Sequence, residues 1–222
     1  DCEFIRAGLR NLPASGGEVI VPPGNYRCDK PIVLDHDNTQ LRGEGTVLLS
    51  LADNINAPVI VMGDIQTPPR STHHLRVENI QIDGNRKHQQ IECWGGPCDS
   101  GETSFIRNNG ISVRATVDSS IQNVTVKAAR SGGIVSERNT SHLTIDGLNS
   151  SDNEFDGYAA CETTDSDFSH MNLHDNQAAG ISTDMQFNRN NIHDSQLTHN
   201  GDVGIFMRAS SHNIYKNLVI SE

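Results

Sequence analysis

Residues 153–182 read NEFDGYAACETTDSDFSHMNLHDNQAAGIS, and they hold a pattern that recurs along the chain. Asn153 is followed four residues later by a glycine and an apolar residue, and the same spacing returns at Asn176. The glycine–apolar pair occurs at intervals of 23, 24, 23 and 24 residues, as Gly110-Ile111, Gly133-Ile134, Gly157-Tyr158, Gly180-Ile181 and Gly204-Ile205. A fixed period of this length is typical of solenoids, in which each repeat forms one turn.

A second apolar pattern lies between the glycines and consists of two residues five positions apart. The pairs are Ile121 with Val126, Leu143 with Leu148, Phe168 with Leu173, Ile192 with Leu197, and Ile214 with Val219. Parallel strands stacked about 4.8 Å apart would place each residue above its equivalent in the next turn. The sequence therefore predicts an all-β protein, a right-handed parallel β-helix of about 23 residues per turn, with Asn153, Asn176 and Asn200 stacked as an asparagine ladder.

The whole chain, 1–222, is predicted to form this single domain. Residues 1–30 should form an N-terminal cap and first coil, because apolar residues at helical spacing in 2–12 indicate a short amphipathic helix that plugs the core. Residues 84–109 break the repeat and are interpreted as a loop excursion. No capping element follows the last repeat, so further chain or a partner is expected there. Strands are expected at Gly17–Tyr26 (two, with a turn), Ile32–Leu34, Val47–Leu49, Val59–Met62 and Leu75–Ile82.

The composition suits an elongated solenoid with a thin core, since 35% of residues are apolar and 5% aromatic. The sequence contains no run of 18 apolar residues, so no membrane span is predicted. We see no signal peptide at the start and expect a mature or trimmed form. A net charge of −11 argues against non-specific nucleic-acid binding. It leaves open an anionic polysaccharide, because a local basic groove can lie on an acidic body.

Five cysteines bear on the compartment. Cys2 and Cys28 both fall in the cap region, and Cys93 and Cys98 lie in one Gly/Pro-rich loop, so we expect two disulfides, with Cys161 left as a reduced thiol. Zinc is the alternative, but no CxxC motif or His pair at ligand spacing favours it. The disulfides would indicate a secreted protein, extracellular or periplasmic.

Several segments resemble a known family. The catalytic module of secreted mannuronan C5-epimerases is similar in Ile82-Asp83-Gly84-Asn85-Arg86, Leu143-Thr144-Ile145, Asp152-Asn153 and Asp156-Gly157-Tyr158. The segment 22–26, Pro-Pro-Gly-Asn-Tyr, resembles the opening coil of pectate-lyase-like β-helices. The family's catalytic Asp-Pro-His-Glu run aligns with Val135-Ser136-Glu137-Arg138, and its next-rung Asp aligns with Cys161, so its principal acid–base residues are not retained. The resemblance implies the β-helix fold and a polysaccharide substrate.

Strand alternation predicts which side chains point outward. One outward column is Ser112, Val135, Ala159, Ser182 and Phe206, and the other is Arg114, Glu137, Cys161, Asp184 and Arg208. In the second column two carboxylates are flanked by two guanidiniums. Arginine can hold a uronate carboxylate bidentately, and a carboxylate can transfer a proton. The predicted catalytic residues are therefore Glu137, Asp184, Arg208 and Arg114, although inter-rung ion pairs explain the same pattern.

Three functions remain open for this column. The first is epimerase- or lyase-like action on an anionic, uronate-containing glycan. The second is an inverting glycoside hydrolase, because Glu137 and Asp184 lie two rungs apart, about 9–10 Å. The third is a non-catalytic glycan-binding or structural solenoid. Substrate contacts are predicted from the loop and the outward column at Arg86, Lys87, His88, Trp94 and Phe206.

No cofactor is required by these hypotheses. Aspartates in turns could bind Ca²⁺, although Asx turns explain them as well; they are Asp152, Asp156, Asp175 and Asp194. Histidines beside turns are interpreted as solvated or turn-bonding side chains and not as metal ligands; they are His170, His174, His193 and His199.

Overall fold

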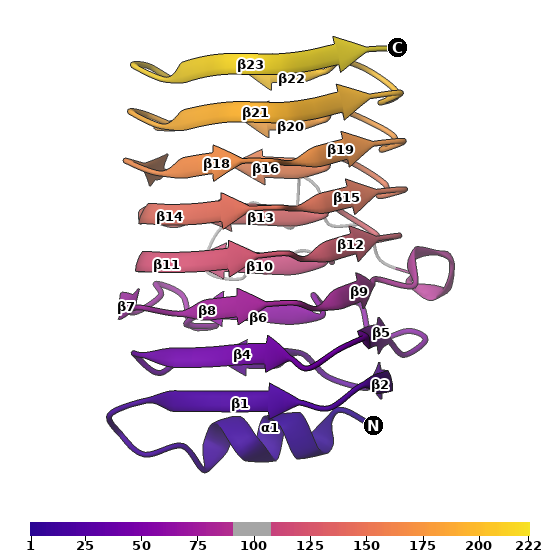
Figure 1. Cartoon of the computed structure of the whole chain (residues 1–222), viewed down its shortest axis with the longest axis vertical. Helices are drawn as coiled ribbons and strands as arrows, with labels where there is room; N and C mark the ends of the chain where they lie inside the picture. Colours follow the sequence, from indigo (N-terminus) through magenta and orange to yellow (C-terminus); the bar gives the residue numbers. More distant parts are fainter. Residues whose placement is uncertain (91–107) are drawn as a thin grey trace.

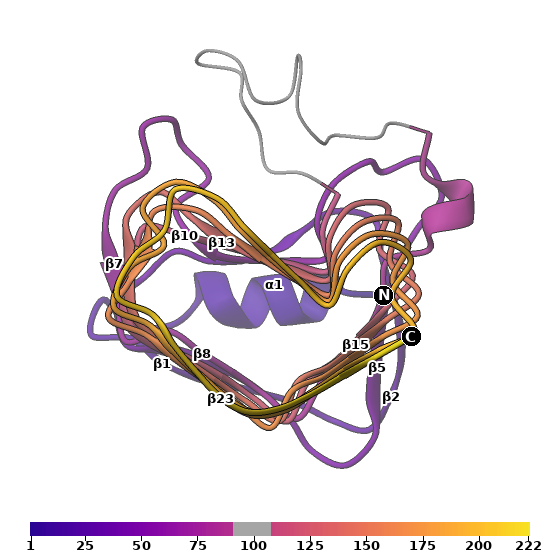
Figure 2. The ribbon, with the colours of Figure 1, turned by 90° about the horizontal axis from the view of Figure 1, so that it is seen from above.

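The computed structural model describes residues 1–90 and 108–222. They form a right-handed parallel β-solenoid of about eight turns, stacked from the N-terminal helix to the C-terminus (Figure 1). Two sheets run along its length, and their inner faces enclose the core (Figure 2). The predicted fold class is therefore confirmed.

The larger sheet, sheet A, holds sixteen strands. They are β1 (Gly17–Val21), β2 (Gly24–Cys28), β4 (Thr39–Gly43), β5 (Val47–Leu51), β7 (Thr72–His73), β8 (Arg76–Glu78), β9 (Gln81–Asp83), β11 (Thr116–Gln122), β12 (Thr125–Lys127), β14 (Thr140–Asp146), β15 (Asn149–Ser151), β17 (Thr163–Thr164), β18 (Asp167–Ser169), β19 (Asn172–His174), β21 (Asn191–Thr198) and β23 (Ile214–Ser221). Sheet B holds β3 (Ile32–Leu34), β6 (Ile60–Gly63), β10 (Ile111–Arg114), β13 (Ile134–Glu137), β16 (Tyr158–Ala160), β20 (Ile181–Thr183) and β22 (Ile205–Met207).

The glycine repeat sets the register of sheet B. The apolar residues after the glycines pair in one column, as predicted, in the order Ile111, Ile134, Tyr158, Ile181 and Ile205. The first four are fully buried. The glycines are required because a Cβ at Gly157 or Gly180 would lie 2.9 Å or less from an asparagine amide or the next glycine's carbonyl oxygen.

The asparagine ladder is also present. The Asn153 side-chain amide donates to Asn176 Oδ1 at 2.8 Å, and the Asn176 amide donates to Asn200 Oδ1 at 2.9 Å. Backbone N–H groups of Asn153 and Asn176 donate to the same oxygens. The ladder therefore satisfies buried polar groups from one turn to the next.

The second apolar pattern was wrong in its register at four positions. The inward columns of sheet A are Ile121, Ile145, Phe168, Ile192 and Tyr215, and Val126, Ser150, Leu173, Leu197 and Ile220. Leu143 pairs with Ser119, Leu148 lies just before β15, and Ile214 and Val219 are exposed. The inward pairs are also five apart, across the turn between the two halves of sheet A, but position 150 is a polar serine and the apolar Ile214 and Val219 lie directly beside Tyr215 and Ile220. The apolar pattern alone therefore selected the wrong residues in these two repeats.

That turn uses a left-handed backbone conformation once in each repeat. Positive φ angles occur at Asn79, Asn123, Gly147, His170, Asp194 and Asn217. Asparagine, aspartate and glycine tolerate this region better than other residues. The turn residues are therefore structural, which agrees with the interpretation of His170 and Asp194 as turn side chains.

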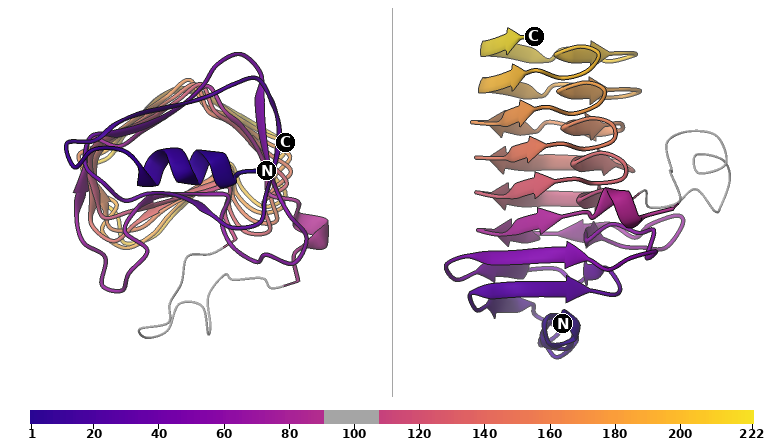
Figure 3. Two further views of the ribbon diagram at one scale, coloured as in Figure 1. Left: turned by 90° about the horizontal axis from the view of Figure 1, so that it is seen from below. Right: turned by 90° about the vertical axis from the view of Figure 1, so that its right-hand side faces the viewer.

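Helix α1 (Glu3–Arg10) lies across the N-terminal end of the solenoid (Figures 1 and 3). Ile5 and Leu9 are buried against the first turns, whereas Phe4 is 45% exposed. Cys2, next to the helix, forms the predicted disulfide with Cys28, with 4.9 Å between the Cα atoms. The predicted Cys93–Cys98 disulfide lies outside the described residues.

At the other end, the last turn exposes apolar side chains, among them Met207, Ile214, Val219 and Ile220. The loop expected at 84–109 begins with the short 3₁₀ helix η1 (Arg86–His88), and the chain is described again from residue 108.

None of the described helices is long and apolar enough to cross a membrane.

Candidate functional site

The predicted charged column lies at the C-terminal ends of the sheet B strands. Arg114 pairs in register with Glu137, and the backbone N–H groups of Cys161, Asp184 and Arg208 continue the parallel ladder. The side chains differ in accessibility, because Arg114 is 0% and Glu137 15% exposed, whereas Asp184 is 32% and Arg208 66% exposed. The five positions are therefore aligned as predicted, but only the C-terminal part is open to solvent.

Arg114 is not a surface residue, which corrects the expectation for it. Its Nε donates to Glu137 Oε1 at 3.2 Å, and its Nη1 donates to the backbone oxygen of Asp64 at 3.2 Å. Its Nη2 has no hydrogen-bond partner among the described residues. Burial lowers the pKa of the guanidinium, opposed by the Glu137 carboxylate. The residues after β6 cover it, so Arg114 cannot contact a polymer on the outer surface.

Asp184 and Arg208 form a bidentate ion pair between neighbouring rungs. Arg208 Nε donates to Asp184 Oδ1 at 2.8 Å, and Nη2 contacts Oδ2. The hydrogen bond from Arg208 lowers the pKa of the Asp184 carboxyl. Asp184 is thus ionised at neutral pH and a weak base, while the pair presents a planar array of donors and acceptors.

The first outward column is covered at its first three rungs. Ser112, Val135 and Ala159 are only 2–3% exposed. By contrast, Phe206 is 46% exposed on β22, and Met185, which follows Asp184, is 57% exposed. The accessible part of this face therefore consists of Asp184, Met185, Phe206 and Arg208, and we call it the β20–β22 face.

A pocket of about 610 Å³ lies beside the covered end of the charged column. One wall is the segment 64–71, called the proline loop, which contains a cis Thr67–Pro68 bond. The other wall comes from turns that follow the sheet B strands. The lining residues are Thr67, Pro68, Pro69, Ser71, Ala115, Arg138, Asn139 and Glu162. This pocket was missed from the sequence, although the Pro68-Pro69 pair after a strand was a signal of a loop at that place.

The loop residues that were predicted to contact substrate lie away from the charged column. Arg86 is paired with Asp152 at 2.9 Å and with Glu154 at 3.7 Å. Figure 2 shows η1, the short magenta helix, on the side of the solenoid opposite β7, which pairs with the start of β11 just after Arg114. Arg86, Lys87 and His88, which were predicted to contact substrate together with the charged column, therefore lie on another side of the solenoid (Figure 2). Trp94 lies outside the described residues.

His88 instead borders a shallow hollow of about 430 Å³ on the outer face of β2, β5 and β9. Its Nδ1 lies 2.7 Å from Asn85 Oδ1, and Asn85 in turn donates to Asp53 at 2.9 Å. Asp53 also pairs with Arg27 at 3.1 Å. These polar groups form hydrogen bonds and an ion pair with one another, so we interpret the hollow as the surface of a polar side-chain network.

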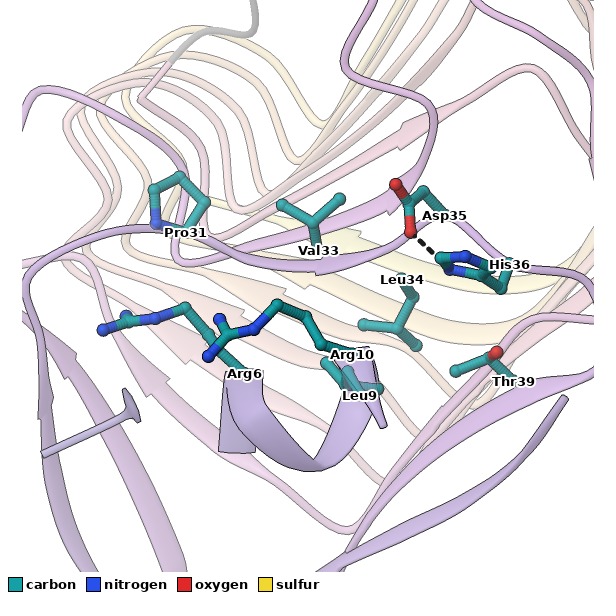
Figure 4. Close-up of a pocket in the computed structure, with 9 residues that line it drawn as sticks. All are labelled: Arg6, Leu9, Arg10, Pro31, Val33, Leu34, Asp35, His36 and Thr39. Atoms are coloured by element: carbon teal, nitrogen blue, oxygen red, sulfur yellow. Dashed lines mark ion pairs between the residues drawn. The ribbon is translucent and has the colours of Figure 1, made fainter. Parts of the chain in front are cut away.

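A third pocket, of about 230 Å³, lies between α1 and β3 (Figure 4). Asp35 and His36 form an ion pair at its rim, 2.8 Å apart. Arg6 donates to Glu3, to the Lys30 backbone oxygen and to Asp29. Its guanidinium therefore holds the helix against the next turn.

The described residues contain no group of three or more His, Cys, Asp or Glu side chains that could hold a metal ion. The turn aspartates considered for Ca²⁺ have other partners. Asp152 pairs with Arg86, Asp175 with His174 at 2.6 Å, and Asp194 with His193 at 2.6 Å. The hydrogen bond that His193 donates to the Asp194 carboxylate raises the pKa of His193.

Asp156 is the carboxylate whose environment the sequence did not reveal. It is 3% exposed and accepts a hydrogen bond from the Ala179 N–H at 2.9 Å. Burial raises its pKa to about 6, and the charge of Asp202 contributes in the same direction. Its position at the sheet edge opposite the charged column makes it a structural acceptor for the next rung.

The two stacked parallel sheets define a right-handed parallel β-helix. A family model described as "right handed beta helix region" matches residues 70–219. The chain therefore belongs to the right-handed β-helix family. No curated protein matches the sequence.

Solved structures share the fold at low sequence identity. The N-terminal fragment of bacteriophage Phi29 gene product 12 is 17% identical with a TM-score of 0.65, over 90% of this chain and 38% of that one. The endo-xylogalacturonan hydrolase of Aspergillus tubingensis is 15% identical with a TM-score of 0.67, over 91% and 54%. The A-module of Azotobacter vinelandii mannuronan C-5 epimerase AlgE6 is 16% identical with a TM-score of 0.51, over 96% and 70%. The chain thus spans between 38% and 70% of the length of these three structures.

Proposed function

We propose that the chain binds an anionic polysaccharide on the β20–β22 face of sheet B. The observation that carries this proposal is the exposed Phe206 ring beside the bidentate Asp184–Arg208 pair. An aromatic face with planar polar groups suits a sugar ring and its hydroxyls, and a guanidinium suits a uronate carboxylate. The polysaccharide-directed names of structural neighbours support the same class of ligand.

A panel of uronans and neutral polysaccharides tests the proposal by affinity electrophoresis. Arg208→Ala should weaken binding of a uronan about 10-fold, and the effect should be larger at low salt, where charge attraction is least screened. Arg189→Ala is the matched control, because Arg189 forms the same bidentate pair with Asp165, at 2.7 and 2.6 Å, outside this face. Equal losses in both variants, or no binding to any glycan, would reject this site.

A second candidate is proton-transfer chemistry of the epimerase or lyase kind at Glu137. It is favoured by the position of Glu137, whose carboxylate is partly buried against the Arg114 cation beside the pocket. Glu137→Gln should then abolish formation of unsaturated or epimerised products, a loss of about 10²–10⁴-fold, while glycan binding persists. An inverting hydrolase would instead release reducing ends and would need a carboxyl with a raised pKa, whereas that of Asp184 is lowered.

We also propose that the protein is secreted and acts in an extracellular or periplasmic compartment. The Cys2–Cys28 disulfide favours an oxidising compartment, extracellular or periplasmic. Most polysaccharides of this kind are met outside the cytoplasm. Fractionation of the source cells, with detection of the oxidised Cys2–Cys28 peptide by mass spectrometry, tests this placement.

A further inference from the structure

The side chains of the charged column become less exposed toward the proline loop. Exposure falls from 66% at Arg208 to 32% at Asp184 and 15% at Glu137, and it is 0% at Arg114. The covering group is the start of the loop, because the backbone oxygen of Asp64 accepts from Arg114. A polymer that follows the column from β22 toward β10 would therefore meet an obstruction at the rung of Glu137.

The proline loop is held in place by its own bonds. The Asp64 carboxylate accepts from the backbone N–H groups of Gln66 and Arg70, both at 2.9 Å. The Arg70 guanidinium reaches back to the Asp35 backbone oxygen at 2.6 Å. These contacts tie both ends of the loop, so it forms a fixed wall across the path.

The pocket of about 610 Å³ lies at the foot of this wall. Arg138 and Glu162, which line it, directly follow Glu137 and Cys161 of the column. The pocket thus offers a cation, a carboxylate, the Asn139 amide and apolar proline surface. A few polar groups on an apolar lining are typical of small-molecule sites, and the volume is within their usual range of about 300–1,000 Å³.

We infer that the proline loop makes this a chain-end site, in which the terminal sugar of the polysaccharide occupies the pocket. The following sugars lie along the column toward Arg208, which is three rungs and about 14 Å away. Arg138 pairs with the terminal uronate carboxylate, while Asn139 and Glu162 bond its hydroxyls. This inference rests on the proposed polysaccharide binding and adds that the protein recognises an end and not an internal segment.

The stoichiometry of binding tests the inference. Size-fractionated polygalacturonate and polymannuronate would be titrated into the full chain by isothermal calorimetry, with fractions of increasing length. An end-binding protein gives one bound protein per polysaccharide chain at every length. A ratio that rises in proportion to length, with binding retained, would overturn the end recognition while leaving the proposed function intact.

Two tryptophan substitutions in the proline loop locate the site. Ser71→Trp fills the pocket from an exposed position and should weaken binding of the fractions at least about 10-fold. Gln66→Trp is the control, because Gln66 is exposed in the same loop but does not line the pocket. Unchanged affinity in Ser71→Trp would overturn the inference, and failure of the wild-type chain to bind either uronan would overturn it together with the proposed function.

Discussion

At the scale of single residues, the buried carboxyl of Asp156 makes the free energy of unfolding depend on pH. Its folded-state pKa of about 6 is above the ordinary value of 3.8, so the carboxyl binds its proton more tightly in the folded state. The stabilisation is complete below the ordinary pKa and is lost as the pH rises through about 6. Asp156→Asn keeps an acceptor for the Ala179 N–H and removes the buried charge.

We therefore expect Asp156→Asn to match the wild type near pH 4 and to exceed its unfolding free energy by about 2–3 kcal/mol at pH 7.5. Urea denaturation at several pH values measures this difference. Asp118→Asn is the control, because the Asp118 side chain is 51% exposed. A difference that does not change with pH would show that Asp156 is not held in its neutral form.

The asparagine ladder gives a second residue-scale prediction. Asn176 is 1% exposed and bonds Asn153 below and Asn200 above. Asn176→Ala leaves the buried Asn153 backbone N–H without its acceptor and removes the side-chain bonds that join the three asparagines, so it should cost about 2–4 kcal/mol of unfolding free energy. Asn172→Ala, an exposed asparagine of β19, should cost far less in the same chemical denaturation. Similar costs would mean that the ladder does not stabilise the buried turn.

At the scale of elements, the aromatic stack in the core predicts a sharp contrast between two phenylalanines. Phe168 lies between Tyr158 and Phe187, with ring centroids 4.9 and 6.0 Å away. Phe168→Ala should cost about 3–5 kcal/mol through the cavity that it leaves. Phe206→Ala, on the outer face, should change stability much less and impair glycan binding instead. Thermal unfolding and binding, measured on both variants, would contradict this division if Phe206→Ala were the more destabilised.

Some elements were predictable from sequence and others were not. The last five sheet B strands, β10, β13, β16, β20 and β22, follow directly from the glycine repeat, because each glycine is needed where chains approach closely. Strand β4 was missed since its sequence, TQLRG, contains a single apolar residue, Leu41. The register of sheet A was misread at Leu143 and Val219, because the inward position 150 is a polar serine and Val219 lies beside the equally apolar inward residue Ile220.

At the scale of the whole molecule, the order of the charged column followed from the repeat, but its accessibility did not. Arg114 was placed on the right rung and pointed outward, yet it is buried, because an insertion after β6 folds over it. Likewise, sequence proximity to the loop suggested Arg86 as a substrate contact, whereas it pairs with Asp152 and Glu154. The path of a long loop depends on tertiary contacts that a repeat pattern does not contain.

On the outside of the solenoid, we propose that the polysaccharide lies on the β20–β22 face. Hydroxyl-radical footprinting with and without a bound uronan tests it most directly, because Met185 and Phe206 are exposed there and oxidise readily. A glycan bound on this face should protect both residues and leave His142 and His170, which are exposed from sheet A, unchanged. Protection of these histidines with unaltered oxidation of Met185 and Phe206 would contradict it.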